Sequence, residues 1–527
     1  MSNTLEDTQD APESSRALAL PGYLVLDKKR WLWLLWAAVI GLLVVAMLTR
    51  LYHLNQPFDR DGYDEGVYWQ SLRAMLAGES LYHTIFYSQP PMFLFSVFPG
   101  FALFGGTLWS ARFGVVLVSL LGFLGAGLLG KALAGRLGIV LALLLLVVDA
   151  RYLAESQTLQ GEAPSVALTF LAVGFAFLWW KQPDGWRGVC WAALSGIALA
   201  LSILCKLLCV STLVPIVLLL AARIWQISRK QPGTNRQSWL PVLAGVAAGL
   251  VTTLVVVFPF LGTFSSFWSG VITFHQAAAL ADPGTPQQNF TLMEPVLFSF
   301  LALAALFGTG AACVRRDWRV LPILAWLLIT LGLLIRQYPL FDHHLIIIEP
   351  PFIALALLGV ANPTSASYQT LLSRLRLKIP VSSILLLGIL LILVASAVNV
   401  SRDLHYYKTG NESTASAFTQ KTLQVASDLR QAITPDEWVI TDGQFIAGLA
   451  DRNTPPSLVD TSTVRITSGY VTLAQLEQAA TDPRVHAVLF FGNRFEVLSQ
   501  TAGFHAWVAL HFHLLKSYGA GEELWVR

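Results

Sequence analysis

Charged side chains are scarce in this sequence. Asp, Glu, Lys and Arg make up 13% of its 527 residues, whereas hydrophobic residues make up 55% and the mean hydropathy is +0.59. This composition excludes an ordinary water-soluble globular protein, whose core needs far less apolar material. The net charge of +3 is small and the basic residues form short clusters between apolar runs, which argues against binding to nucleic acid. The sequence therefore predicts a polytopic α-helical membrane protein.

Cysteine is also rare. Cys190, Cys205, Cys209 and Cys313 are the four cysteines, and each falls inside an apolar run. Their spacing is not that of a metal-ligand set. We interpret them as small hydrophobic core residues, not as disulfide partners or metal ligands.

No cleavable signal is evident at the start of the chain. Residues 1–27 are rich in Ser, Glu and Asp, which predicts a disordered cytoplasmic tail. Lys28, Lys29 and Arg30 then precede an apolar run over residues 31–48, which is long enough to span a bilayer and lacks an Ala-x-Ala cleavage site. We expect this run to be a retained membrane anchor.

Long apolar runs predict about eleven membrane spans within residues 28–400. Their centres lie near residues 40, 119, 146, 171, 195, 216, 250, 302, 328, 352 and 390. Residues 92–104 are apolar as well, but a span needs roughly 20 residues. We therefore expect this segment to fold back against the membrane surface.

Basic clusters predict the orientation of the spans. If residues 92–104 do not cross, all the clusters fall on one side, which the positive-inside rule assigns to the cytoplasm. The clusters are Lys28–Arg30, Lys131/Arg136, Lys181/Arg187, Arg223/Arg229/Lys230/Arg236, Arg315/Arg316/Arg319 and Arg374/Arg376/Lys378. The chain is then integral to a bacterial-type cytoplasmic membrane, with a cytoplasmic N-terminus. Residues 51–107 form an extracytoplasmic loop.

This orientation brings the polar interruptions of the apolar chain to the outer face. They are Asp64, Glu65, Glu155, Glu162, Lys206, His275, Arg336, Asp342, His343 and His344. Ionisable groups at the edge of a membrane domain are costly and are usually functional or paired. Arg151 and Glu155 are four residues apart, and we interpret them as an ion pair.

Residues 401–527 have a different character, because Glu, Asp, Gln and Thr return. Helix-like stretches at 415–431, 473–480 and 505–515 alternate with strand-like stretches at 438–441, 487–491 and 524–526. The pattern predicts a soluble extracytoplasmic α/β domain of about 125 residues. It contains no phosphate loop, no Gly-x-Gly-x-x-Gly and no Ser/His/Asp constellation, so we expect it to serve packing or acceptor positioning.

Asp64 is the best candidate for a catalytic base on the outer face. If residues 64–68 are helical, Tyr68 shares the face of Asp64 and Glu65 points elsewhere. An Asp with an ordinary pKa near 4 is ionised at neutral pH and can accept a proton, a role worth about 10²- to 10⁴-fold in rate. Capping of a short interfacial helix is the structural alternative.

Three further positions could bind a substrate phosphate or orient an acceptor. Lys206 interrupts a long apolar run and could hold a lipid phosphate, or it could snorkel to the headgroups. His343 and His344 could bind phosphate oxygens; a metal site is the alternative, although adjacent histidines rarely reach one ion together. Glu162 opens a helix, where it could orient the acceptor or only complement the helix dipole.

Several short motifs occur in a set order along the chain. They are Asp64-Glu65-x-x-Tyr68, Gln89-Pro90-Pro91, Phe104-Gly105-Gly106, Ala111-Arg112, Glu162 with Pro164, and Pro339-Leu340-x-x-His343-His344 followed by Pro350-Pro351. Over residues 31–360, this order resembles the GT-C glycosyltransferases. More narrowly, it is similar to the glycosyltransferase 39-like branch, which holds the protein O-mannosyltransferases and the aminoarabinose transferases of lipid A.

The resemblance implies the GT-C fold and an inverting sugar transfer. The donor would be a polyprenyl-phosphate-linked sugar in the membrane, the acceptor a lipid, glycan or protein, and no cofactor or nucleotide sugar would be bound. By resemblance, Asp64 takes the catalytic position with Glu65 beside it. Glu162 takes the second carboxylate position, where the aminoarabinose transferases carry Asp. The sugar, the acceptor, the oligomeric state and any need for a divalent metal stay open.

One position departs from the family pattern. The aminoarabinose transferases have a Lys that contacts donor phosphate immediately before the Pro-Pro-like pair, whereas this chain has Gln89. We therefore expect the phosphate to rely on Lys206, Arg112 or the pair His343 and His344. Tyr68, Gln89 and His275 complete the substrate-binding set that we expect.

Two other functional classes are compatible with a polytopic chain. A secondary transporter tends to show repeated halves and charged sites near the bilayer midplane. This chain shows no internal repeat, and its ionisable residues gather at one interface. A non-catalytic scaffold would not explain that gathering. A transporter, or another polyprenyl-lipid-dependent enzyme such as a ligase, remains the alternative.

Overall fold

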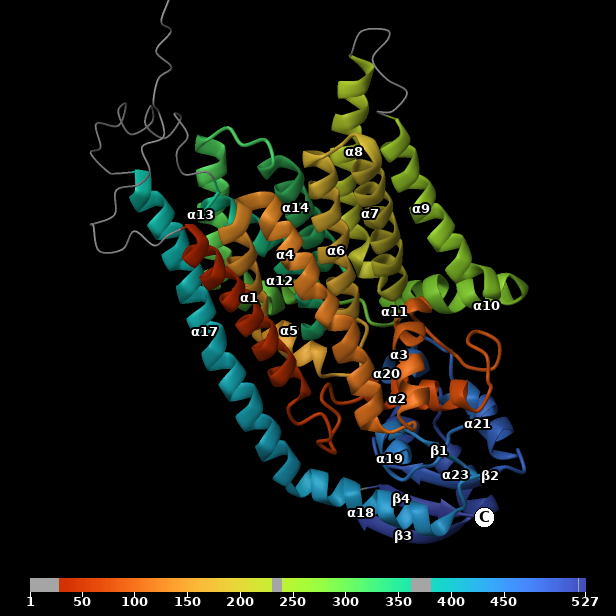
Figure 1. Ribbon diagram of the computed structural model, residues 1–527. Coiled ribbons are helices and arrows are strands. Elements are labelled where there is room, and N and C mark those ends of the chain that lie inside the picture. Colours follow the sequence, from red (N-terminus) through yellow and green to blue (C-terminus); the bar gives the residue numbers. More distant parts are fainter. Residues whose placement is uncertain (1–27, 230–238, 362–380, 520) are drawn as a thin grey trace, which may run out of the picture.

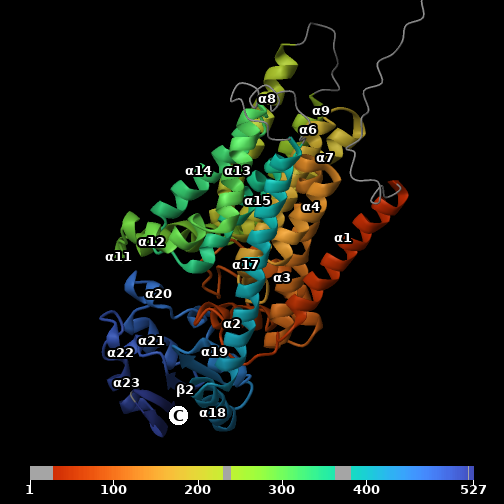
Figure 2. The same cartoon turned by 90° about the vertical axis from the view of Figure 1, so that its left-hand side faces the viewer.

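The computed structural model describes residues 28–229, 239–361, 381–519 and 521–527. A helical bundle forms one end of the molecule and a small sheet domain forms the other, with α2 (Asp64–Leu76) and α3 (Met92–Leu103) between them (Figures 1 and 2). The expected tail 1–27 lies outside the described residues. So do Lys230, Arg236 and the basic cluster at residues 374–378.

The bundle is built from apolar helices. They are α1 (Lys28–Leu51), α4 (Leu108–Val147), α6 (Glu162–Lys181), α7 (Gly185–Cys205), α8 (Leu213–Ser228), α9 (Leu240–Val257), α13 (Phe300–Val314), α14 (Val320–Arg336), α15 (Glu349–Gly359) and α17 (Val381–Ala415). Among the described residues, eight helices are long and apolar enough to cross a membrane, or up to nine if the bent pair of α12 (Pro286–Leu297) and α13 is one span. The expected count of about eleven is not confirmed.

Helix α4 explains part of this difference. Its 40 residues include non-helical backbone at Ala134 and Gly135, where Gly135 has a φ of +71°. A Cβ atom on Gly130 would lie 2.1 Å from the Gly138 carbonyl oxygen, although residues eight apart in a straight helix are about 12 Å apart along the axis. The chain therefore doubles back here, and the apolar runs expected near residues 119 and 146 form the two arms of α4, which counts as one of the eight candidate spans.

The short segment expected to lie against the membrane is helix α3, with 12 residues. Its buried side chains Phe93, Val97 and Phe101 pack in one hydrophobic core with residues of α2 and α4. Gly114 of α4 allows a close approach, because a Cβ atom there would lie 2.8 Å from Val97 Cγ1. Helix α3 thus packs against both α2 and α4.

Shorter elements connect the long helices around the end of the bundle that faces the sheet domain. They are α5 (Ala150–Ser156), η1 (Leu207–Thr212), η3 (Phe258–Thr263), α10 (Phe264–Trp268), η4 (Ser269–Thr273), α11 (Phe274–Ala281) and η5 (Asp342–Ile348). Figure 1 shows α10 and α11 lying across the end of α9. Of these connections, η1, η4, α11 and η5 contribute residues to the cavity described below.

The C-terminal region contains a four-stranded sheet in the order β1-β2-β4-β3, in which β1 and β2 are parallel and the other pairs antiparallel. The strands are β1 (Trp438–Thr441), β2 (Val485–Phe490), β3 (His513–Gly519) and β4 (Glu522–Val526), and the helices are α18 (Ala417–Ala432), α19 (Gln444–Leu449), η6 (Pro456–Leu458), α20 (Thr463–Thr467), α21 (Leu473–Ala480), α22 (Arg494–Val497) and α23 (Phe504–His511). The α/β prediction is confirmed.

Two local predictions in this region differ from the structure. The helix expected over residues 505–515 ends at His511, because residues 513–519 form β3 and pair with β4. This long-range pairing overrides the local helical pattern. Helix α17 continues to Ala415, beyond the boundary expected at residue 400, and leads from the bundle to the sheet domain (Figure 2).

Candidate active site

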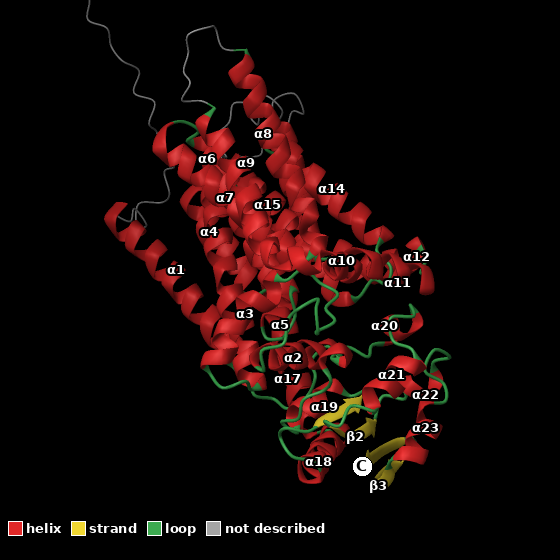
Figure 3. Ribbon diagram, turned by 90° about the vertical axis from the view of Figure 1, so that its right-hand side faces the viewer, coloured by secondary structure: helices red, strands yellow, loops and turns green. Residues whose placement is uncertain are grey.

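Asp64 is the first residue of α2, and this helix lies at the junction of the bundle and the sheet domain (Figure 3). Helix α2 packs closely on α19, because a Cβ atom on Gly66 would lie 2.4 Å from the Phe445 backbone nitrogen. Gln70 adds hydrogen bonds, since its Nε2 donates to the Arg452 carbonyl at 3.1 Å. The start of α2 is therefore held against the C-terminal domain.

A cavity of about 710 Å³ lies beside Asp64. Of the residues expected to form the site, seven line this cavity: Asp64, Tyr68, Gln89, Lys206, His275, His343 and His344. Its wall also includes apolar side chains such as Leu207, Ile272 and Leu333. A pocket with apolar walls and a few convergent polar groups is the usual form of a small-molecule or lipid site.

Lys206 provides a cation in the wall of the cavity. The backbone leaves helical geometry at this residue, with φ −150° and ψ 122°, so the expected break after α7 is confirmed. Lys206 is 6% exposed, and its Nζ lies 2.5 Å from Oε1 of the buried Glu162. The side chain is thus paired inside the protein instead of snorkelling to the membrane surface.

His343 and His344 approach the same carboxylate. Their Nε2 atoms lie 3.7 and 3.9 Å from Glu162 Oε1, and the ligand atoms of the three residues lie within 4.8 Å of one another. Both histidines therefore approach the same carboxylate oxygen, whereas we expected that adjacent histidines rarely reach one ion together. One carboxylate and two imidazoles form a donor set suited to zinc. The Lys206 ammonium group would have to move before Glu162 could bind a divalent ion.

Acidic side chains also line the cavity, among them Asp61, Asp64 and Asp460. Burial raises the pKa of Asp64 well above its ordinary value; Asp61 and Asp460 raise it further, whereas Lys206 lowers it. Burial and the Asp59 carboxylate likewise raise the pKa of Asp61 well above its ordinary range. The ordinary pKa that we expected for Asp64 is therefore wrong in this environment.

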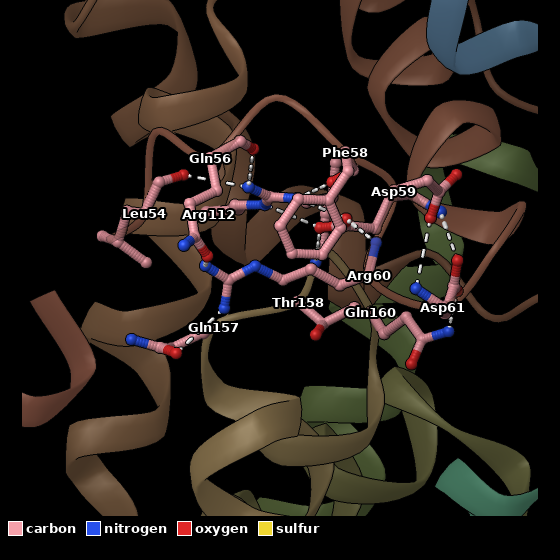
Figure 4. Close-up of polar contacts among 12 residues, drawn as sticks. Leu54, Gln56, Phe58, Asp59, Arg60, Asp61, Arg112, Gln157, Thr158 and Gln160 are labelled. Atoms are coloured by element: carbon pink, nitrogen blue, oxygen red, sulfur yellow. Dashed lines mark hydrogen bonds and ion pairs between the residues drawn. The ribbon is translucent and has the colours of Figure 1, made fainter. Parts of the chain in front are cut away.

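Glu65 and Arg112 are brought together, but neither lines the cavity. Both side chains are fully buried, and Arg112 Nη2 lies 2.5 Å from Glu65 Oε2. Arg112 also donates to the carbonyl oxygens of Leu54, Gln56 and Phe58 (Figure 4). This arrangement shapes the backbone of the loop before Asp64.

Glu65 also binds the backbone of two loops, the one before α2 and the one between α5 and α6. It accepts hydrogen bonds from the backbone nitrogens of Arg60 at 2.7 Å and Leu159 at 2.8 Å. Burial alone would raise the pKa of Glu65, but the Arg112 guanidinium outweighs burial and the pKa lies below its ordinary value. Glu65 is therefore a carboxylate that holds the loop in place.

The residues around Gln89 are fixed by backbone contacts. The Gln89 carbonyl accepts a hydrogen bond from the Tyr82 hydroxyl at 2.6 Å. His275 Nε2 lies 2.7 Å from the Ser88 carbonyl oxygen, to which it donates in the corresponding tautomer. Lys206, which lines the same cavity, supplies a cation where Gln89 supplies none.

The C-terminal domain contributes cavity residues that the sequence did not identify. They are Asp460, Ser462, Thr463, Val464 and Arg494. They lie 396 to 430 positions after Asp64 in the chain, and no motif links them to it. The expected ion pair of Arg151 with Glu155 is wrong, because Arg151 pairs with Asp342 at 3.0 Å and with Glu349 at 3.8 Å.

Comparisons with known proteins agree with the motifs. Residues 38–275 match the family model of dolichyl-phosphate-mannose-protein mannosyltransferases. The fold is similar to ArnT from Cupriavidus metallidurans bound to undecaprenyl phosphate, with a TM-score of 0.59 and 15% identity over 95% of this chain and 98% of that chain.

A second solved structure has a related fold. The archaeal oligosaccharyltransferase AglB from Archaeoglobus fulgidus, in complex with an inhibitory peptide and a dolichol-phosphate, is 13% identical with a TM-score of 0.50. The similarity covers 88% of this chain and 70% of that chain. No curated protein sequence matches significantly. The chain therefore has the fold of these solved structures, and its residues 38–275 are similar to the protein-mannosyltransferase family.

Proposed function

We propose that the protein is an inverting glycosyltransferase that moves a sugar from a polyprenyl-phosphate donor to an acceptor at the extracytoplasmic face of the membrane. One observation carries the proposal: Asp64 lines the same cavity as Lys206, His343 and His344. A base and a cationic phosphate cradle are the minimum set for this chemistry. Undecaprenyl phosphate in the similar ArnT structure supports the donor class.

The donor would lie with its phosphate toward Lys206 and the histidines. Glu162 holds the Lys206 ammonium group in place, and the apolar residues Leu207, Leu208 and Leu333 of the wall offer a surface to the first prenyl units. Burial of Lys206 strengthens its attraction for a phosphate, because the local dielectric is lower than in water. Lys206 thereby takes the role that a cation at position 89 would have.

Asp64 would act as the general base. It accepts the proton of the acceptor hydroxyl while that oxygen attacks the anomeric carbon of the donor sugar. The bond between this carbon and the phosphate oxygen breaks, and its electron pair leaves with the phosphate toward Lys206. Attack on the face opposite the leaving group inverts the configuration. The raised pKa of Asp64 makes its ionised form a stronger base than an ordinary Asp.

The charge pattern supports one orientation of the protein in the membrane. We propose that the N-terminus is cytoplasmic and that the cavity and the C-terminal domain are extracytoplasmic. Arg223 belongs to α8, which ends at the side of the bundle opposite the sheet domain (Figure 1). A basic residue near that end fits the positive-inside rule. No nucleic acid takes part in this function.

The test is Asp64→Asn, produced in cells that lack the native protein. We expect product formation to fall at least 100-fold, measured by mass spectrometry of membrane lipids and glycoproteins. Binding of farnesyl phosphate to the purified variant should stay within twofold of the native value, because Lys206 is intact. Asp436→Asn changes an exposed acid outside the cavity and serves as the matched control. Normal turnover by Asp64→Asn would contradict the assignment of the base.

A further inference from the structure

The C-terminal domain closes one side of the cavity with a carboxylate of its own. Asp460 lines the cavity together with Ser462 and Thr463, and its side chain is buried, with 7% of the residue exposed. A buried carboxylate needs hydrogen-bond donors, because its desolvation is costly. This domain is therefore more than a support for α2.

Asp460 is held in a defined position. Its Oδ1 accepts a hydrogen bond from the Ser462 backbone nitrogen at 2.8 Å, and its backbone carbonyl accepts one from Arg465. A carboxylate can accept about four hydrogen bonds in all. Several acceptor positions therefore remain for a molecule in the cavity.

Asp460 and Asp64 are linked through their neighbours in the chain. The Tyr63 hydroxyl lies 3.1 Å from Thr461 Oγ1 and accepts a hydrogen bond from the Thr461 backbone nitrogen at 2.8 Å. The Arg494 guanidinium lies over the Tyr63 ring, 4.0 Å from its centroid. The contact between residues 63 and 461 thus holds together the two segments that carry Asp64 and Asp460, although the chain separates residues 63 and 461 by 398 positions.

Two carboxylates that line one cavity can each accept a hydrogen bond from a different hydroxyl group of one bound molecule. We propose that Asp460 positions a saccharide acceptor by accepting a hydrogen bond from the hydroxyl next to the one that Asp64 deprotonates. The proposal rests on the glycosyltransferase function above. A sugar ring offers such a pair of hydroxyl groups, whereas a Ser or Thr side chain offers one hydroxyl only. Asp460 is therefore a positioning residue for the acceptor.

The test compares acceptors that differ by one hydroxyl. Purified protein receives polyprenyl-phosphate sugars extracted from the source membranes, with methyl hexopyranosides as acceptor probes and their monodeoxy analogues lacking one neighbouring hydroxyl. We expect the native protein to use the best parent probe at least tenfold better than its deoxy analogue, measured as kcat/KM. Asp460→Asn should use both at similar rates, with a raised KM for the parent, and Asp460→Glu should regain part of the preference.

Two controls establish whether a lost preference comes from the Asp460 carboxylate itself. Farnesyl phosphate should bind Asp460→Asn as it binds the native protein, which shows that the membrane domain is folded. Asp436→Asn should keep the native preference. An equal preference in Asp460→Asn and the native protein would overturn the proposal, as would transfer to a Ser/Thr peptide probe but to no saccharide. Absence of any transfer by the native protein, to probes or to endogenous acceptors, would instead overturn the proposed function.

Discussion

At the scale of single residues, the acids near Asp64 affect the pH range in which it can act as the proposed base. Burial raises the pKa of Asp59 to about 6, and the pKa values of Asp61 and Asp64 lie well above their ordinary range. The folded protein therefore binds more protons than the unfolded chain above about pH 4. The contribution of these acids to the free energy of unfolding is fully present below that pH and is lost as the pH rises through the raised pKa values.

A pH profile tests this electrostatic coupling. Asp64 must be ionised to act as a base, so kcat/KM should rise with pH through its raised pKa. Asp61→Asn removes the neighbouring carboxylate that raises this pKa, so the acidic limb of the profile should move to lower pH. The measurement is the transfer rate between about pH 4 and 9, which brackets the ordinary and raised values. Asp436→Asn should leave the limb in place, and an unmoved limb in Asp61→Asn would contradict the coupling.

At the scale of elements, one buried ion pair joins three segments of the chain. Glu65 of α2 and Arg112 of α4 bind each other, and they also bind the loop before α2 and the backbone of Leu159. A buried pair is costly to form, but removal of one partner leaves the other charge uncompensated. The pair therefore holds the loop before α2, and with it the start of the helix that carries Asp64, against α4.

The variant Glu65→Gln measures the importance of this pair. It should lower the free energy of unfolding by about 3–5 kcal/mol, because Arg112 stays buried without its anion. The measurement is the midpoint of thermal unfolding in detergent. Glu412→Gln breaks the pair of Lys408 and Glu412, whose side chains are 74% and 65% exposed, and should change the midpoint very little. Equal midpoints for the two variants would mean that the buried pair is not stabilising.

The sequence predicted those parts of the site that lie at polar breaks in apolar helices. Asp64, Lys206 and His343 were found in this way, because each interrupts a long apolar pattern and such interruptions are rarely without a role. The contact between Tyr63 and Thr461 could not be predicted, since nothing local marks two residues so far apart. Strand β3 was missed for the same reason: its pairing with β4 depends on the folded domain.

At the scale of the whole molecule, the cavity depends on how the C-terminal domain meets the bundle. The membrane part supplies Asp64, Lys206, His343 and His344, and the domain supplies Asp460 and Arg494. Helix α17 leads from one part to the other, but the close contact is made by α2 against α19. A variant that separates α2 from α19 should therefore open the cavity while both parts stay folded.

Gly66→Ala should have this effect, because its Cβ atom would lie 2.4 Å from the Phe445 backbone nitrogen, which cannot move aside as a flexible side chain would. We expect the transfer rate to fall at least tenfold. Hydrogen exchange should become faster in residues 444–449 of α19 and stay unchanged in the paired strands β1 and β2. Gly310→Ala, at a helical glycine with open space around it, is the matched control. Native exchange and native activity in Gly66→Ala would show that the cavity does not depend on this contact, and faster exchange throughout the sheet would indicate unfolding of the domain instead of its separation from α2.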